Sequence, residues 1–440
     1  MFGGDGDAHV ARDGSEARLG RERRYVMRPE TVETARCDPW QAADETWPDA
    51  GRKLAQLMDL QDEAMRHAMA NGSKGSKMAE LRSIDKNLQE TFALLYETAQ
   101  LLQARNMKLA YETLVNALGP FQRAFREDED AWLVKPMHRM VKNLRSVAEA
   151  CDAVPNGMQE KTNNMADAGA QMMKCFAVSI QAQHNRSKKL AALFIVNELF
   201  KVYFKLNTLH LCKNLVRAVM APTFAKLEEF PMAQRVTYMY YVGRLSVFEE
   251  KYKDAEQQLE FALAHCDKGA VKNKRRILQY LVPVKLGRGH VPSTDLLQKY
   301  QLYEYTDLVG SFKCGSIQAF NQTLLQHQRK FIASGTYLLL EKMKLVVYRT
   351  LFKKVHQVHT KMVLEDAEGR GKSTQISMEM LKASLDWQRV SMDLEEIECL
   401  VANLIYQGYI KGYLSHQKRT LVVSKQDPFP HLFEVAKSSY

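Results

Sequence analysis

Apolar side chains recur every three or four residues from about Leu54 onward, for nearly three hundred residues. Leu81, Ile84, Leu88, Phe92 and Leu95 show this spacing, which places apolar groups on one face of an α-helix. Gly119-Pro120 predicts a break between helices. Strand-like alternation is absent from this stretch. The pattern therefore predicts successive helices joined by short turns, an α-solenoid of helical hairpins.

The segment from Arg235 to Cys266 shows the repeat most clearly. Gly243, Ala255, Leu259 and Ala262 fall where a tetratricopeptide-type repeat places its small and packing residues. Small residues at these positions allow the two helices of one hairpin to approach closely. The tryptophan and the terminal proline of that repeat are missing, so the pattern indicates an architecture and not a ligand.

A long amphipathic helix is predicted to begin near Tyr337. Lys342, Arg349 and Lys353 share one narrow face of this helix, because they lie seven and four residues apart. The opposite side carries an apolar set that we expect to face a core: Leu340, Met343, Val347, Leu351, Val355 and Val358. The basic face is expected to meet solvent or phosphate.

The pattern of a winged helix follows this long helix. After a polar loop, one helix is predicted with Ser377 as its cap, and a second with Asp393 and Glu396 in capping-box spacing. The β-rich runs 409–414 and 420–423 then predict a hairpin with a basic tip over 415–419. Two short helices and a hairpin bury little surface by themselves, so this module should lean on its neighbours.

The expected fold class is mainly α, an α-solenoid of tetratricopeptide-like hairpins followed by a C-terminal winged-helix module with a small β-hairpin. The expected segments are a disordered N-terminal tail (1–50), a helical-repeat array (51–335), the winged-helix part (336–425) and a C-terminal tail (426–440). The first segment is rich in Gly, Asp, Glu and Arg and lacks apolar periodicity.

Charge and cysteine content narrow the class of protein. The 440 residues carry a net charge of +11, with a pI near 9.1, which favours acidic partners such as nucleic acid or an acidic polypeptide. Seven scattered cysteines fit reduced thiols better than a disulfide framework. No apolar run reaches the roughly 18 residues of a membrane span, so we expect a soluble, intracellular protein.

Basic residues gather in three places that could contact phosphate. A solvated helix face is the usual explanation for one such cluster, whereas three that the fold brings together would form a stripe with a steep salt dependence. Base readout by the helix after Asp393 is not expected, because its first turn is acidic and would repel phosphate. The candidate nucleic-acid-binding residues are Lys274, Arg275, Arg276, Lys342, Arg349, Lys353, Lys354, Lys411, His416, Lys418 and Arg419.

No pattern of catalytic residues stands out. The segment 369–374 ends like a phosphate-binding loop, but Asp366 occupies the position of its first glycine. His356 with His359, or His210 with Cys212, lack the context of a metal site. We therefore expect no catalytic residues, no cofactor, no metal and no enzyme activity.

Several long phrases resemble the PCI-domain family, the scaffolds of the proteasome lid, the COP9 signalosome and translation initiation factor three. They are LFIVNELFKVYFKLNTLHLCKNLVRA, AQRVTYMYYVGR, KNKRRILQYLVPVKLGRGHVP and LEKMKLVVYRTLFKKV. The phrase LIYQGYIKGYLSHQKRTLVVSKQDPFP resembles most closely the PCI subunit of TREX-two, a nuclear mRNA-export complex. The resemblance covers about residues 187–430.

The resemblance implies a non-enzymatic adaptor in transcription-coupled mRNA export. Its partners would be a large scaffold subunit with its own PCI-like region, a small acidic disordered subunit, and RNA or DNA bound through the phosphate backbone. The expected location is the nucleus, with the cytoplasm and the nuclear pore as further places. The alternative is a structural lid-type subunit of a signalosome or proteasome-like assembly that binds no nucleic acid.

Partner binding is expected at the hairpin. An exposed apolar edge on 420–423 would pair with a strand of a neighbouring subunit in either function. The candidate partner-binding residues are Tyr413, Leu421 and Val423.

Overall fold

The computed structural model describes residues 47–71, 85–153, 163–181, 185–365, 372–432 and 434–435. The chain forms two compact units, Met1–Cys151 and Asp152–Tyr440. Most of the predicted N-terminal tail, residues 1–46, lies outside the described residues. Within the part that is described, no helix combines the length and the apolar character that crossing a bilayer requires.

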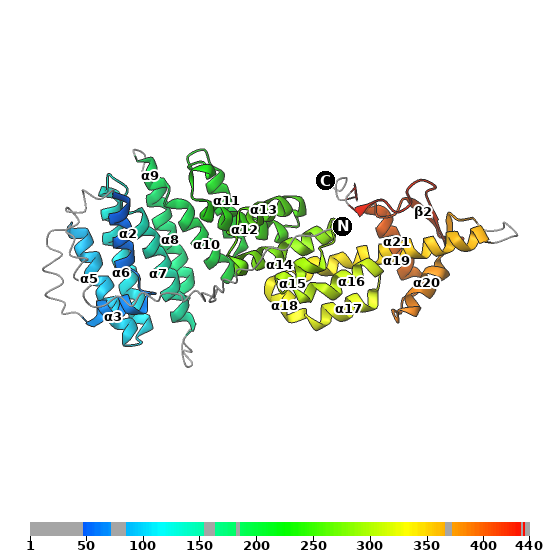
Figure 1. The fold of residues 1–440 in the computed structure, drawn as a ribbon, viewed down its shortest axis with the longest axis horizontal. Coiled ribbons are helices and arrows are strands. Elements are labelled where there is room, and N and C mark those ends of the chain that lie inside the picture. The colour runs from blue at the N-terminus through cyan, green and yellow to red at the C-terminus, as the bar shows by residue number, and fades with distance from the viewer. Residues whose placement is uncertain are drawn as a thin grey trace, which may run out of the picture. The chain divides into compact units, whose positions relative to one another are not determined.

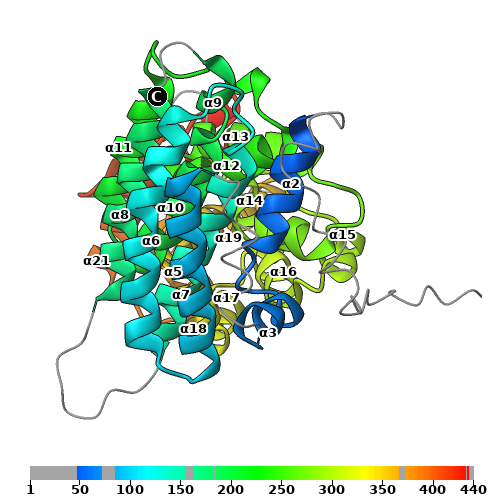
Figure 2. The same cartoon turned by 90° about the vertical axis from the view of Figure 1, so that its left-hand side faces the viewer.

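The first unit is built from antiparallel helices, and Figure 2 shows α5 and α6 side by side. Asp85 caps α5, since its carboxylate accepts hydrogen bonds from the backbone N–H groups of Asn87 and Leu88. The buried amide of Asn143 donates to the carbonyl of Met58 over 2.6 Å and joins α7 to the segment after α2. The helices are α2 (Trp47–Leu57), α3 (Glu63–Asn71), α5 (Lys86–Gln103), α6 (Met107–Glu127) and α7 (Val134–Ala153).

The predicted break at Gly119-Pro120 is wrong, because α6 runs through Pro120 without interruption. A proline inside a helix removes one backbone hydrogen bond. In α6 the flanking side chains Leu118, Phe121 and Phe125 are all buried, and their packing outweighs this loss.

The second unit begins with the helical array that the periodicity predicts. Figure 1 shows α8, α10 and α12 in succession, and neighbouring helices contact each other along the chain. The helices are α8 (Asn164–Ile180), α9 (Arg186–Lys189), α10 (Ala192–Lys205), α11 (Leu209–Met220), α12 (Met232–Phe248), α13 (Tyr252–His265), α14 (Val271–Gly287), α15 (Thr294–Lys299), α16 (Thr306–Cys314), α17 (Ile317–Gln326) and α18 (Gln328–Ser334). Short 3₁₀ turns lie at Leu227–Glu229 and Tyr303–Tyr305.

The hairpin of α12 and α13 has the close approach expected from its small residues. A Cβ atom added to Gly243 would lie 2.7 Å from Cγ of Leu259, which is closer than real Cβ atoms come. Ala255, Leu259 and Ala262 are fully buried in this hairpin. Gly243 therefore sets the distance between the two helices.

The winged-helix module begins with α19 (Tyr337–Glu365) and continues through α20 (Met378–Trp387) and α21 (Leu394–Tyr406). The Ser377 hydroxyl accepts a hydrogen bond from the N–H of Glu379, and Asp393 forms a complete capping box with Glu396. Both predicted helix starts are confirmed. The fold class is confirmed as well, a helical solenoid followed by a winged-helix module.

A three-stranded antiparallel sheet completes the module. Its strands are β1 (Gln375–Ser377), β2 (Gly412–Ser415) and β3 (Thr420–Val423), in the order β1-β3-β2. Ile376 of β1 and Leu414 of β2 both pair with Leu421 of β3. The central strand is therefore β3, and the prediction of an exposed edge on 420–423 is wrong. A three-residue strand after the polar loop covers that edge.

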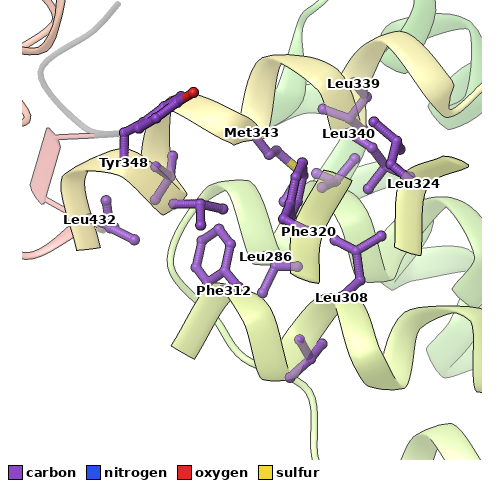
Figure 3. Close-up of a cluster of buried hydrophobic side chains, with 14 of the residues drawn as sticks. Leu286, Leu308, Phe312, Phe320, Leu324, Leu339, Leu340, Met343, Tyr348 and Leu432 are labelled. Carbon is purple, nitrogen blue, oxygen red and sulfur yellow. The ribbon is translucent and has the colours of Figure 1, made fainter. Parts of the chain in front are cut away.

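One continuous cluster of buried side chains joins the last helices of the array to the winged helix. Figure 3 shows Leu286, Leu308 and Phe320 from the array packed around Leu340 and Met343 of α19. The C-terminal residues 427–432 return to this core, where Leu432 lies near Tyr348 in the same view. The winged helix thus leans on its neighbours as predicted.

Candidate nucleic-acid and partner interface

The hairpin tip presents two exposed cations, Lys418 and Arg419. The turn is held by the N–H of Arg419, which donates to the carbonyl of His416 over 3.1 Å. The carbonyl of Arg419 accepts from the N–H of Met378 over 2.9 Å, which ties the tip to the start of α20. Both side chains therefore project from a fixed backbone.

Two other predicted hairpin residues contact acidic side chains. His416 Nδ1 lies 2.7 Å from a carboxylate oxygen of Glu398 on α21, and Lys411 Nζ lies 3.0 Å from a carboxylate oxygen of Asp427. Both basic side chains are exposed. The carboxylate of Asp427 partly compensates the charge of Lys411, and Glu398 engages the ring of His416, so both residues contribute less to phosphate binding than Lys418 and Arg419.

The basic face predicted on α19 does not form a free cationic surface. Lys342 Nζ lies 2.5 Å from a carboxylate oxygen of Glu250, and Lys353 is half-buried. Arg349 is only 6% exposed, so its assignment as a phosphate-contacting residue is wrong. The physical reason is the C-terminal segment, which packs over this face of α19.

Arg349 instead holds that segment in place. One terminal nitrogen of its guanidinium donates hydrogen bonds to the carbonyl oxygens of Phe429 and Pro430. Burial lowers the pKa of this guanidinium, while the charge of Asp427 acts in the opposite direction. The ring of the neighbouring His356 lies 5.7 Å from that of Phe429, and burial also lowers the pKa of His356.

The remaining predicted cations lie further along the second unit. Lys354 Nζ donates to the carbonyl of Cys314 over 2.9 Å, and a terminal nitrogen of Arg275 donates to the carbonyl of Gln301 over 3.2 Å. Arg276 is exposed and Lys274 is half-buried at the start of α14. Figure 1 shows α14 beside the beginning of α19, whereas the hairpin packs against α21. These basic residues thus form separate clusters.

The three predicted partner-binding residues have different environments. Leu421 and Val423 are buried on the inner face of β3, so their assignment to an exposed edge is wrong. Tyr413 is 63% exposed on β2, which among the described strands pairs only with β3. Strand pairing with another chain would therefore use the outer edge of β2, where Tyr413 lies.

Other exposed side chains were not singled out by the sequence pattern. Trp387, the last residue of α20, is 84% exposed, and Tyr406 at the end of α21 is similarly open. Val358 and Met362 of α19 are 53% and 58% exposed, so the expectation that Val358 faces a core is wrong. Helical spacing could have grouped Val358 with Met362, but it could not tell whether another element covers them.

The described residues contain no group of three His, Cys, Asp or Glu side chains placed to hold a metal ion. His356 and His359 lie on α19, where the ring of His359 is 3.4 Å from the carbonyl of Lys372. Residues 366–371, including the first half of the segment 369–374 that resembles a phosphate-binding loop, lie outside the described ranges.

Comparison with known proteins identifies the family of this chain. The PCI domain matches residues 323–425, from α17 to just beyond β3. The PCI domain-containing protein 2 of Xenopus laevis is 41% identical over 332 residues, covering 74% of this chain and 79% of its own length. The chain belongs to the PCI-domain family. The family resemblance of the sequence phrases is thereby confirmed.

Two further relatives extend the comparison. The Enhanced ethylene response protein 5 of Arabidopsis thaliana is 36% identical over 343 residues, covering 78% of this chain and 81% of its own length. The Protein CSN12 homolog of Mycosarcoma maydis is 30% identical over 349 residues, covering 74% and 76%. The similarity therefore extends well beyond the PCI domain into the helical array.

Proposed function

We propose that this chain is a non-enzymatic scaffold subunit of a nuclear mRNA-export complex of the TREX-two type. Membership of the PCI-domain family supports a role as a subunit of a multi-subunit complex. The assignment to mRNA export rests on the hairpin phrase LIYQGYIKGYLSHQKRTLVVSKQDPFP and on the PCI domain-containing protein 2 relatives. We place its action in the nucleus, in transcription-coupled export, with further presence in the cytoplasm and at the nuclear pore.

The proposed partners are a large scaffold subunit with its own PCI-like region, a small acidic subunit, and RNA or DNA. The outer edge of β2 with Tyr413 offers a strand for pairing with the scaffold. Lys418 and Arg419 offer phosphate contacts, because both are exposed on a fixed turn. This hairpin tip is the observation that carries the nucleic-acid part of the proposal.

The second helix of the winged helix does not read bases in this proposal. Glu395 and Glu396 lie in the first turn of α21, and Glu398 binds His416 of the hairpin. Acidic groups at that end repel phosphate. Contact through the sugar-phosphate backbone is therefore expected to be independent of sequence.

The test is a salt titration of single-stranded RNA binding to the full chain, followed by fluorescence anisotropy. The Lys418→Glu/Arg419→Glu variant should bind about tenfold more weakly at low salt. The slope of log affinity against log salt should also shrink by about one to two, because two phosphate contacts are lost.

The matched control reverses two exposed lysines outside the hairpin, Lys299→Glu/Lys313→Glu, which changes the net charge equally. This control should retain most of the affinity. Equal affinity of the wild type and the hairpin variant would reject the nucleic-acid role. It would favour the second candidate, a lid-type subunit of a signalosome or proteasome-like assembly that binds no nucleic acid.

A further inference from the structure

An apolar groove of about 280 Å³ lies between the second half of α19 and α20. Figure 1 shows these two helices beside each other, away from α14. The groove lining is Lys354, Val355, Val358, Met362, Met380 and Ser384. It is separate from the hairpin tip and plays no part in the nucleic-acid contacts proposed above.

Each wall of the groove is one stripe of a helix. Val355, Val358 and Met362 follow each other at three and four residues on α19, so they share one face. Met380 and Ser384 lie four residues apart on α20, and Trp387 continues their stripe three residues later. The ends of each stripe are seven residues apart, about 10 Å or two helical turns. Val358, Met362 and Trp387 are exposed, whereas Val355 and Met380 are half-buried against the core.

A line of charge accompanies each stripe. On α19, Lys354 and Lys361 are the residues immediately before Val355 and Met362, and both are exposed. On α20, the residues immediately before Met380 and Trp387 are Glu379 and Asp386, which are also exposed.

The orientation of these charges follows from their neighbours. Leu381 and Gln388, the residues immediately after Met380 and Trp387, are buried, so the residues before them lie on the solvent side. His356, immediately after Val355, is half-buried against Phe429 in the same way. The groove therefore has a basic rim on α19 and an acidic rim on α20.

We propose that this groove binds one amphipathic α-helix of a partner protein. The apolar face of that helix would lie on Val358, Met362 and Met380, with Trp387 closing over its end. Acidic side chains on one flank would meet the rim of α19, and basic side chains on the other flank would meet the rim of α20. Methionine suits such a surface, because its unbranched side chain adapts to the bound residues.

The charges and the shape of the groove select this occupant. A polyanion such as RNA would be repelled by Glu379 and Asp386 along one rim. A helix presents apolar groups at intervals of three, four and seven residues, the same intervals as the two walls. The two-turn length matches anchors at positions i, i+3 or i+4, and i+7.

The probe is a fluorescein-labelled 18-residue helical peptide with leucines at those intervals, glutamates on one flank and lysines on the other. Fluorescence anisotropy with the full chain should show saturable binding. Met362→Glu should weaken this binding at least tenfold. Leu364→Glu is the matched control, because Leu364 is 79% exposed on the same helix but lies about 200° around from Met362. Its effect should stay within twofold.

Two further measurements locate the peptide. Emission from Trp387 should move to shorter wavelength on binding, and this shift should disappear in Trp387→Phe. Lys361→Glu should weaken binding about threefold or more, and a peptide with lysines on both flanks should recover the affinity.

Several results would overturn the proposal. They are absence of saturable binding, equal binding of a scrambled peptide with the same composition, and equal weakening by Leu364→Glu. Light scattering provides one more. If the full chain is a dimer that Met362→Glu dissociates, the occupant is a second copy of this chain and not a partner helix.

Discussion

Arg349 is a buried charge whose hydrogen bonds join two parts of the second unit. Arg349→Met keeps an unbranched apolar stem but removes the guanidinium, which leaves the carbonyls of Phe429 and Pro430 without this donor. We expect the free energy of unfolding to fall by about 1.5–3 kcal/mol, the usual cost of losing hydrogen bonds to a buried charged group. Urea denaturation followed by circular dichroism measures the change.

Lys353→Met is the control for this measurement, because Lys353 lies one turn further along α19 and is only half-buried. Its unfolding free energy should change by less than about 0.5 kcal/mol. If the two variants unfold at the same urea concentration, Arg349 does not stabilise the C-terminal segment.

The spacing of residues places Arg349 on the same helix face as Lys342 and Lys353. It does not predict which other segment covers that face. The covering groups come from residues 429–432, about 80 positions later in the sequence. Local caps behaved differently, since Ser377 and Asp393 act on N–H groups two and three residues away. Predictions were therefore reliable where the partner is local in sequence, and failed where it is distant.

Two glycines that lie within helices allow a matched test of how closely α12 and α13 pack. Gly243→Ala places a methyl group against Leu259 and should destabilise the α12–α13 hairpin by about 1–3 kcal/mol. Gly310 lies in α16 with nothing within 4 Å of an added Cβ, so Gly310→Ala should be neutral or stabilise by up to about 1 kcal/mol. Thermal unfolding of the two variants compares these effects.

The double variant Gly243→Ala/Leu259→Ala checks the cause. Removing the Leu259 side chain opens space for the new methyl group, so the two substitutions should cost less together than the sum of each alone. Simple additivity would mean that Gly243 acts through backbone flexibility and not through close approach.

The sequence predicts the type of each secondary-structure element better than its length or the elements that it contacts. The 3.6-residue periodicity identified the helical array, and the change to β-rich runs identified β2 and β3. The short strand β1 has only three residues, too few for a pattern, yet it makes β3 the central strand. The helix break predicted at Pro120 is wrong, because burial of the surrounding side chains stabilises α6 through this residue.

At the scale of the whole molecule, the proposed function predicts which complex contains the chain. Purification of the tagged full chain from cells under low salt should recover one large scaffold subunit and one small acidic subunit in comparable amounts. Quantitative mass spectrometry measures their ratio. Stoichiometric recovery of signalosome or proteasome-lid subunits instead would reverse the assignment to an export complex. A parallel purification in high salt is the control for the low-salt purification.

The single long helix α19 sets the orientation of the winged helix relative to the end of the helical array. Its first half lies in the core of the array, and its second half carries one wall of the groove and the contacts to the winged helix. Each residue of an α-helix advances the direction of its side chains by about 100°. Adding or removing one residue between Tyr348 and Val355 would therefore turn everything beyond it by more than a quarter of a circle. In this chain the number of residues in that segment therefore sets the direction in which the groove and the winged helix face.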